Sequence, residues 1–361
     1  MKQLISLQIV RFVAAALVVW CHVADSTVRL GRPSAGAGIL HLNNIGAVGV
    51  DLFFVLSGIV IFLSVRRDET TETKSHAWDF LRKRLIRVIP IYWIVSLPLI
   101  LIDLFFGRIG LHGLFVTLTF WPALPGGVFM PYLSVGWTLC FEMLFYMALF
   151  CVLLWKNSAF FILSIFVFCM ILNTQMQFSV SQFLGNPIIF EFLFGVGIAF
   201  FILRHTFSPL SGLVAMSAGI IALCATAVWG YGGISRAQDI LSAHLSWERL
   251  LLWGIPSALI VFGSISLERY CRGSQVAAKL AIFGDASYSI YLVHRPLISL
   301  FETTGNLWSS LPMAAYAVTL IALSIIIGLC VYLVIERPLL GLLRRLTVRL
   351  ISAPPLTVNT P

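Results

Sequence analysis

The feature that most constrains this chain is a series of ten apolar segments, each close to the length that crosses a bilayer. A transmembrane helix needs about 20 mostly apolar residues to span a hydrocarbon layer roughly 30 Å thick. Of the 361 residues, 59% are hydrophobic and 11% are charged, whereas soluble domains carry about 25% charged residues. The sequence therefore predicts an all-α polytopic membrane helix bundle, with little room for a separate soluble domain. The expected spans are residues 4–23, 45–65, 88–106, 136–155, 158–173, 187–203, 209–229, 249–267, 283–302 and 313–335.

One further apolar segment, residues 111–135, is interrupted by three prolines and by the pair Gly126–Gly127. Proline and glycine both disfavour a continuous helix. We therefore expect a re-entrant or interfacial loop there. If the segment crossed the membrane, the chain would have eleven spans and every later segment would take the opposite orientation.

The distribution of basic residues predicts the orientation. Lys and Arg accumulate in the cytoplasmic loops of membrane proteins. With a cytoplasmic N-terminus and ten spans, 17 of the 24 Lys and Arg residues fall on the inner side and five on the outer side, while Arg11 and Arg295 lie within spans. Both termini are therefore expected to be cytoplasmic. The same bias accounts for the net charge of +9 without a nucleic-acid partner.

The sequence lacks the motifs of several other classes of functional site. It contains no P-loop, GxSxG or GxGxxG pattern, and no HExxH or CxxC spacing for a metal. The seven cysteines lie mostly in apolar segments, so we expect neither a disulfide framework nor a metal site. Because Arg11 interrupts the first apolar segment and no A-x-A site follows it directly, this segment is expected to be retained and not cleaved as a signal peptide.

Two ionisable residues, Arg11 and His22, stand in the first expected span. Charged side chains within spans usually face the bundle interior and mark a substrate pathway or a site. Eleven residues of helix bring these two to one face, about 16 Å apart along the axis. Arg11 would then lie in the inner half and His22 near the outer end. A snorkelling arginine with an interfacial histidine explains this spacing, and so does a functional pair, because histidine can act as a general base near neutral pH.

A carboxylate, Glu142, is expected two turns into the apolar helix of residues 136–155. Thr138 and Tyr146 lie four residues before and after it, on the same helix face. An unpaired carboxylate is costly in apolar surroundings, so it needs a partner, and Arg11 or His22 are the candidates. The same helix begins with Trp137.

Asp51 opens the second expected span, in the stretch GVDLFFVLSG, where Ser57 and Gly58 favour close helix packing. The helix dipole alone also favours an acid at this position. A polar stripe of Ser287, Tyr291 and His294 follows one face of the ninth span. Hydrogen bonding between helices explains that stripe as well as a pocket does.

Basic residues crowd the inner end of the third expected span, where the stretch FLRKRLIRVIPIYW contains Arg82, Lys83, Arg84 and Arg87. Anchoring on the cytoplasmic side is one explanation. Arginine also binds phosphate in a planar, bidentate geometry. The cluster therefore also fits a clamp for a cytoplasmic cosubstrate that carries a nucleotide.

Taken together and in this order, these stretches resemble the acyltransferase-3 family of bacterial integral membrane proteins. The resemblance covers nearly the whole chain, and it implies an acyltransferase-3 transmembrane domain over residues 4–338 and a cytoplasmic tail over residues 339–361. The chain departs from the family pattern at two positions. Thr138 stands where the family commonly has serine, and Arg295 stands between His294 and Pro296. The matching residues are Arg11 and His22, spaced by ten residues; Gly49–Phe54 with Ser57–Gly58; Arg84, Arg87, Pro90 and Tyr92; Trp137, Leu139, Glu142 and Tyr146; and Ser287–Tyr288, Tyr291–Leu292, His294 and Pro296.

The resemblance implies an O-acyltransferase of the bacterial inner membrane, of the stand-alone exopolysaccharide or lipopolysaccharide type. Such proteins transfer an acyl group, most often acetyl, from cytoplasmic acetyl coenzyme A to a hydroxyl of a polysaccharide or lipid-linked oligosaccharide. Membrane lipid is the other expected partner, and the sequence does not indicate an oligomeric state. A transporter or flippase of an amphiphilic glycan precursor is the alternative, although the paired half-chain repeat of many transporters is not found.

The resemblance also implies roles for single residues. His22 is expected to act as general base or to carry the acyl group briefly, while Arg11 holds the donor, polarises its carbonyl or orients Glu142. Arg82, Arg84 and Arg87 are expected to bind the phosphates of coenzyme A. The remaining pocket candidates are Asp51, Ser57, Trp137, Tyr146, Ser287, Tyr291 and His294.

Overall fold

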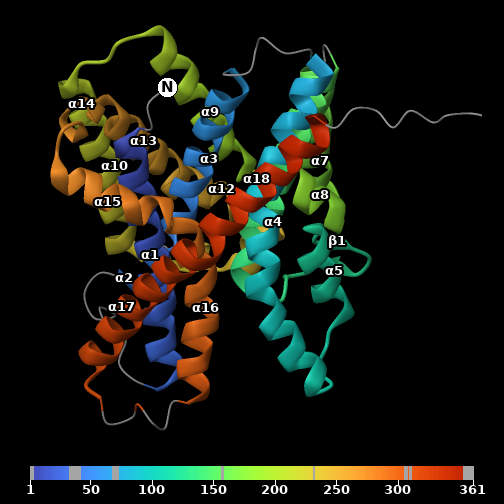
Figure 1. Cartoon of the computed structure of the whole chain (residues 1–361), viewed down its shortest axis with the longest axis vertical. Helices are drawn as coiled ribbons and strands as arrows, with labels where there is room; N and C mark the ends of the chain where they lie inside the picture. Colours follow the sequence, from blue (N-terminus) through green and yellow to red (C-terminus); the bar gives the residue numbers. More distant parts are fainter. Residues whose placement is uncertain are drawn as a thin grey trace, which may run out of the picture.

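The computed structural model confirms an all-α membrane bundle (Figure 1). Within the residues that it describes, nine helices are long and apolar enough to cross a membrane, and a helix pair bent by 57° would make a tenth. Each of the ten coincides with a predicted span. The described residues are 4–31, 42–66, 73–155, 158–230, 232–304, 308 and 311–352. The candidate spans are Ile5–Arg29, Val48–Val65, Ser75–Phe105, Ser134–Leu154, Ser158–Gln175, Ser179–Arg204, Pro209–Trp229, Ser246–Ser266, Met313–Leu346 and the bent pair Gln275–Asp285 with Ser287–Thr303.

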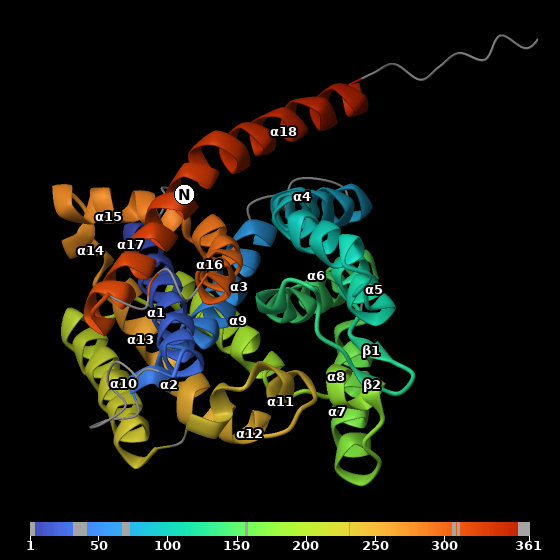
Figure 2. The ribbon, with the colours of Figure 1, turned by 90° about the horizontal axis from the view of Figure 1, so that it is seen from below.

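The first helix, α1 (Ile5–Arg29), is the centre of one half of the molecule (Figure 2). It is continuous over 25 residues, and helices from both ends of the chain pack around it. Those helices are α2 (Leu42–Ile45), α3 (Val48–Arg66), α13 (Ile255–Ser266), α14 (Glu268–Cys271), α15 (Gln275–Asp285), α16 (Ser287–Thr303) and α17 (Met313–Val331).

The other half is built from the middle of the chain and lies to one side in Figure 2. Its helix α4 packs against α6, and α9 packs closely on α3 and so joins the two halves. These elements are α4 (Thr73–Phe105), α5 (Leu111–Thr119), α6 (Trp137–Leu154), α7 (Ser158–Gln175) and α8 (Ser179–Leu184), whereas α9 (Ile189–Arg204) lies beside α3 in the first half. The remaining elements are α10 (Pro209–Trp229), η2 (Gly232–Ser235), α11 (Ala237–Leu241), α12 (Ser246–Arg249), η3 (Leu250–Gly254), η5 (Tyr332–Glu336) and α18 (Arg337–Ser352).

Two glycines set the close approach of α3 and α9. A methyl group added at Gly58 would lie 2.0 Å from the carbonyl oxygen of Phe192, and one at Gly195 would lie 2.0 Å from that of Val55. Small residues let helix backbones approach in membranes, where packing contacts replace the hydrophobic effect between helices. The close packing predicted at Ser57–Gly58 is thus observed.

The segment 111–135 forms no membrane-spanning helix, as predicted. The nine residues of α5 give a helix of roughly 14 Å, well short of the hydrocarbon layer. A short hairpin follows, in which β1 (Ala123–Leu124) pairs antiparallel with β2 (Gly127–Val128). The turn requires a φ of 94° at Gly126, which glycine adopts without strain. The 3₁₀ turn η1 (Ser134–Gly136) then leads into α6.

The last helix extends further than the predicted span 313–335. A π-helical turn, η5, joins α17 to α18, and Met313–Leu346 qualifies as one candidate span. The start of α1 and the end of α18 lie toward the same end of the bundle (Figure 1), as an even number of spans requires. The last nine residues of the predicted tail lie outside the described residues, as do four of the basic residues used to predict the orientation: Lys2, Arg32, Arg67 and Lys156.

The predicted orientation can be tested with two exposed arginines, each just beyond the end of a span. Arg108 follows α4 and Arg204 ends α9. In a cysteine-free background, Arg108→Cys should react with a membrane-impermeant maleimide in intact cells, because it is expected outside. Arg204→Cys should react only after the membrane is permeabilised. The reverse labelling pattern would show that the termini face outward.

Candidate active site

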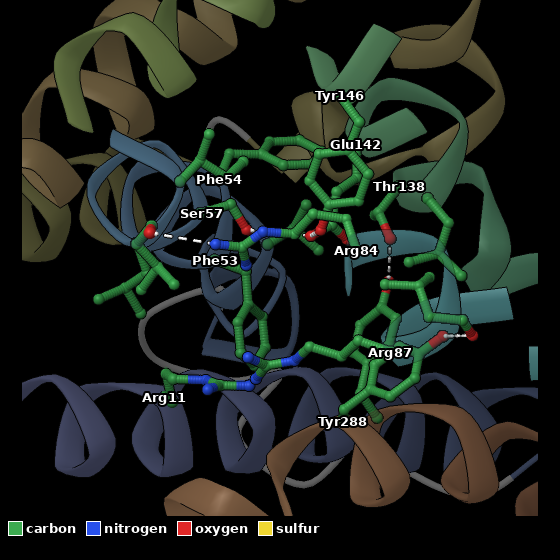
Figure 3. Close-up of a pocket in the computed structure, with 17 residues that line it drawn as sticks. Arg11, Phe53, Phe54, Ser57, Arg84, Arg87, Thr138, Glu142, Tyr146 and Tyr288 are labelled. Atoms are coloured by element: carbon green, nitrogen blue, oxygen red, sulfur yellow. Dashed lines mark hydrogen bonds between the residues drawn. The ribbon is translucent and has the colours of Figure 1, made fainter. Parts of the chain in front are cut away.

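A cavity rich in charged groups lies between α1, α3, α4, α6 and α16 (Figure 3). We call it the inner cavity, because it is lined near the end of the bundle that is predicted to face the cytoplasm. Its space is about 90 Å³. Its lining residues are Arg11, Val50, Phe53, Phe54, Leu56, Ser57, Val60, Ile61, Arg84, Arg87, Val88, Thr138, Leu139, Glu142, Tyr146, Tyr288 and Tyr291.

Arg84 is held firmly in the wall of this cavity. Its guanidinium donates hydrogen bonds to the carbonyl oxygen of Val60 at 3.2 Å and to Ser64 Oγ at 2.6 Å. It also lies over the rings of Phe80 and Tyr146, 5.8 and 6.0 Å from their centroids, where cation–π attraction operates. Arg84 therefore fixes α4 against α3 and α6 and presents a buried positive charge at the cavity.

Arg11 and Arg87 are placed differently, because their side chains point toward one another across the cavity (Figure 3). Within the part of the chain that the structure describes, neither forms a hydrogen bond or an ion pair. Glu142, Glu336 and Asp285 attract Arg11 only through longer-range electrostatics. Two like charges this close repel in a low-dielectric interior. An anion between them would relieve the repulsion and satisfy their N–H groups.

Glu142 obtains its hydrogen bonds from nearby hydroxyl groups. It accepts from the hydroxyl of Tyr146 and, at 3.5 Å, from Ser57 Oγ. The sequence suggested Arg11 or His22 as its partner. Arg11 acts on it from a distance, and His22 lines a different cavity. The partner one helical turn away, Tyr146, was available from the i, i+4 spacing.

A second and larger cavity, of about 570 Å³, lies toward the other end of α1. We call it the outer cavity. His22 and Asp25 line it from α1, and polar groups from distant parts of the chain complete it. Its lining residues are Val18, Cys21, His22, Asp25, Asn44, Ala47, Val50, Val135, Trp137, Gly230, Gly233, Ser235, Arg236, Ala237, Arg249 and Tyr291.

The inner and outer cavities share two lining residues, Val50 and Tyr291. The Tyr291 hydroxyl donates to the carbonyl oxygen of Val135 at 2.9 Å and shares a hydrogen bond of 3.0 Å with Thr138 Oγ1. The Tyr291 side chain thus stands at the boundary between the two spaces. Because α1 is an unbroken helix, it carries Arg11 in one cavity and His22 in the other, about 16 Å apart along its axis.

Comparison with known proteins decides the family. A family model described as an acyltransferase domain matches residues 4–333. The chain belongs to the acyltransferase-3 family. It is 33% identical over 326 residues to the exopolysaccharide production protein ExoZ of Rhizobium meliloti (strain 1021), covering 85% of this chain and 94% of that protein. It is 23% identical over 394 aligned positions to the acyltransferase MdmB of Streptomyces mycarofaciens, covering 94% and 92%. No solved structure matches the chain.

Membership in the acyltransferase-3 family makes this chain a membrane acyltransferase, and the structure locates the residues that carried the resemblance. Most of them line one of the two cavities. Arg82, which was predicted to bind the phosphates of coenzyme A, lines neither cavity, and its side chain pairs with Asp79 at 2.7 Å. Ser287 and His294 are fully buried beside the cavities, and neither is part of their lining.

Asp51 lies outside both linings and is paired with Arg249, in a contact that the sequence did not predict. Arg249 Nε and Nη2 donate to the two carboxylate oxygens of Asp51 at 2.9 and 2.8 Å, and both side chains are fully buried. The guanidinium also donates to the carbonyl oxygens of Ala47 and Ile234. Arg249 lines the outer cavity. The pair therefore joins α3, α12 and η2 around that cavity.

Breaking this pair should destabilise the protein. Removing one partner of a buried ion pair costs about 3–5 kcal/mol, because the other charge stays buried and unpaired. We expect Arg249→Met to lower the melting temperature of the purified protein clearly. Arg236→Met is the matched control: Arg236 has an exposed side chain and lies 4.0 Å from Asp239, a pair worth about 1 kcal/mol or less. Equal melting temperatures for the two variants would contradict the structural role of the pair.

Proposed function

We propose that this chain is an inner-membrane O-acyltransferase that moves an acyl group, in the simplest case acetyl, from a coenzyme A thioester to a hydroxyl of a surface polysaccharide or its lipid-linked precursor. One observation carries the proposal. A single helix places Arg11 and His22 in two cavities that share Tyr291 as a lining residue. The name of the relative ExoZ, an exopolysaccharide production protein, supports the choice of acceptor class.

The donor side of the proposal rests on the arginines of the inner cavity. Arg11 and Arg87 point at one space and have no partner among the described residues, and the phosphates of coenzyme A would supply the missing acceptors. A space of about 90 Å³ is too small for a nucleotide but admits the thin thioester arm and, at the end of that arm, the diphosphate that links it to the nucleotide. The nucleotide would therefore stay at the mouth, where the exposed Lys83 adds positive charge. The charge of Arg82 is offset by its pairing with Asp79.

The distance along α1 restricts the role of Arg11. It lies about 16 Å from His22 along the axis, so it cannot touch a carbonyl that reacts beside His22. This favours holding the donor over polarising the thioester. The arm of coenzyme A would extend past Tyr291 and bring its acyl group to the boundary of the outer cavity. Glu142 would offset part of the positive charge of the arginines.

The acceptor side rests on the outer cavity. Its space of about 570 Å³ falls within the usual range for small-molecule pockets. Asp25, Asn44 and Arg236 offer hydrogen-bonding groups, and Trp137 and Tyr291 offer aromatic surface. This combination of polar and aromatic lining suits the hydroxyl groups and apolar faces of a sugar.

In the proposed reaction His22 is the general base. It takes the proton from the acceptor hydroxyl as that oxygen attacks the thioester carbonyl. The carbon–sulfur bond then breaks, and the leaving thiolate takes the proton back from His22. The products are the acyl ester and free coenzyme A, with no net change in the enzyme. None of these reaction steps requires a metal.

Replacing His22 tests the catalytic half of the proposal. His22→Ala should reach the membrane at normal abundance and lower the transfer rate by about 10²–10⁴-fold, the usual contribution of a general base. NMR of the purified surface glycan should then show loss of O-acylation. A fully acylated glycan in cells with this variant would exclude His22 as the base.

Replacing Arg87 tests the donor half and separates an enzyme from a flippase, which has no need for coenzyme A. Loss of a charge-assisted hydrogen bond costs about 1.5–3 kcal/mol, so Arg87→Ala should raise the Kd for coenzyme A at least about tenfold in calorimetry. Arg82→Ala is the matched control from the same stretch, and it should change the Kd far less. If the wild-type protein does not bind coenzyme A, the donor assignment is wrong.

A further inference from the structure

A second histidine lies directly behind His22. His294 of α16 is fully buried and lines neither cavity. Its ring centroid is 5.1 Å from that of His22, and the two ring planes are tilted by 34°. His22 is thus placed between the outer cavity on one side and His294 on the other.

The contacts of His294 favour the tautomer that carries its proton on Nδ1. Its Nδ1 lies 3.3 Å from the carbonyl oxygen of Ile290, one helical turn earlier. A carbonyl oxygen only accepts, so this contact is a hydrogen bond when Nδ1 carries the proton. In the neutral ring Nε2 is then a bare acceptor.

No donor among the described residues satisfies the His294 Nε2 acceptor. His294 Nε2 is buried and has no hydrogen-bond partner among the described residues. The other aromatic neighbour, Tyr291, has its ring 5.8 Å away, and its hydroxyl is engaged with Val135 and Thr138. A buried acceptor without a donor is energetically unfavourable. The His22 ring can supply the missing N–H.

We propose that His294 is a positioning residue for His22: its Nε2 accepts a hydrogen bond from one ring N–H of His22, and this leaves the other His22 nitrogen unprotonated toward the outer cavity. The consequence for catalysis rests on the proposed function. In that reaction the free nitrogen takes the proton of the acceptor hydroxyl, and the bond to His294 stabilises the imidazolium that forms. The proton returns to the leaving thiolate, and His294 keeps its own proton throughout.

The charged residues around His22 interact mainly with one another, so a neutral hydrogen-bond partner such as His294 suits the His22 ring. Arg29 and Arg295 both act on His22 electrostatically, and Glu302 pairs with each of them, at 2.7 and 3.6 Å. Asp25 lines the outer cavity beside His22 and also interacts with both arginines. The neighbouring charges are therefore largely balanced among themselves. His294 is therefore the neighbouring group that can orient the His22 ring.

The test measures the His22 nitrogen itself as well as turnover. Diethyl pyrocarbonate acylates an unprotonated imidazole nitrogen, and mass spectrometry gives the rate at His22. In His294→Leu, this rate should fall several-fold and its dependence on pH should shift, while kcat falls on the order of tenfold or more and the Kd for coenzyme A stays the same. His294→Gln keeps an acceptor near the position of Nε2 and should recover most of both rates.

His76→Leu is the matched control. His76 is also buried with an unpartnered Nε2 among the described residues, but it belongs to α4 and lines neither cavity. Its loss should leave the reactivity of His22 unchanged. Equal effects of Leu and Gln at position 294, or wild-type reactivity of His22 in His294→Leu, would overturn the proposal.

A measurement on the wild-type protein covers the case in which the variants do not fold. Solid-state ¹⁵N NMR of histidine-labelled protein should show His294 protonated at Nδ1, with Nε2 accepting a hydrogen bond. A His294 ring that carries its proton on Nε2 would overturn the proposal. The reactivity and NMR readouts do not depend on acyl transfer, so a failure of the proposed function is distinguishable from a failure of the histidine pair.

Discussion

The structure depends on one constraint: a charged group inside a bundle of apolar helices is costly unless it is paired or faces a cavity that a polar ligand can enter. Asp51 and Arg249 meet the first condition, fully buried and bonded through both carboxylate oxygens. Arg11 and Arg87 meet the second, side by side in the inner cavity. The same distinction separates groups that hold the helices together from groups that remain available for a substrate.

The two departures from the family pattern fit this architecture. Thr138 keeps the hydroxyl that a serine would offer, and it uses it to bind Tyr291 at the boundary of the two cavities. Arg295 pairs with Glu302, which also pairs with Arg29. Through Glu302, Arg295 therefore helps tie α16 to the end of α1 that lies close to His22.

Much of the fold could be predicted because membrane insertion is decided locally. Each span needs only its own run of apolar residues, so all ten were recognisable, and the prolines and glycines of residues 111–135 marked the segment that does not cross. The relation of Arg11 to His22 was predictable for the same reason, since both belong to one helix of fixed geometry. The partner Tyr146 of Glu142 also lies within one helix.

What the sequence determined by itself was therefore the set of helices and the contacts within each one. Only the tertiary structure decided which polar groups meet across helices: Asp51 with Arg249, at a sequence separation of 198, and His22 with His294. It also separated Arg84, which turns into the cavity, from Arg82 in the same short stretch. The physical reason is that helix periodicity fixes the direction of a side chain only relative to its own axis. Which neighbour it meets depends on how the helices pack, and here that packing is set by close contacts such as Gly58 against Phe192.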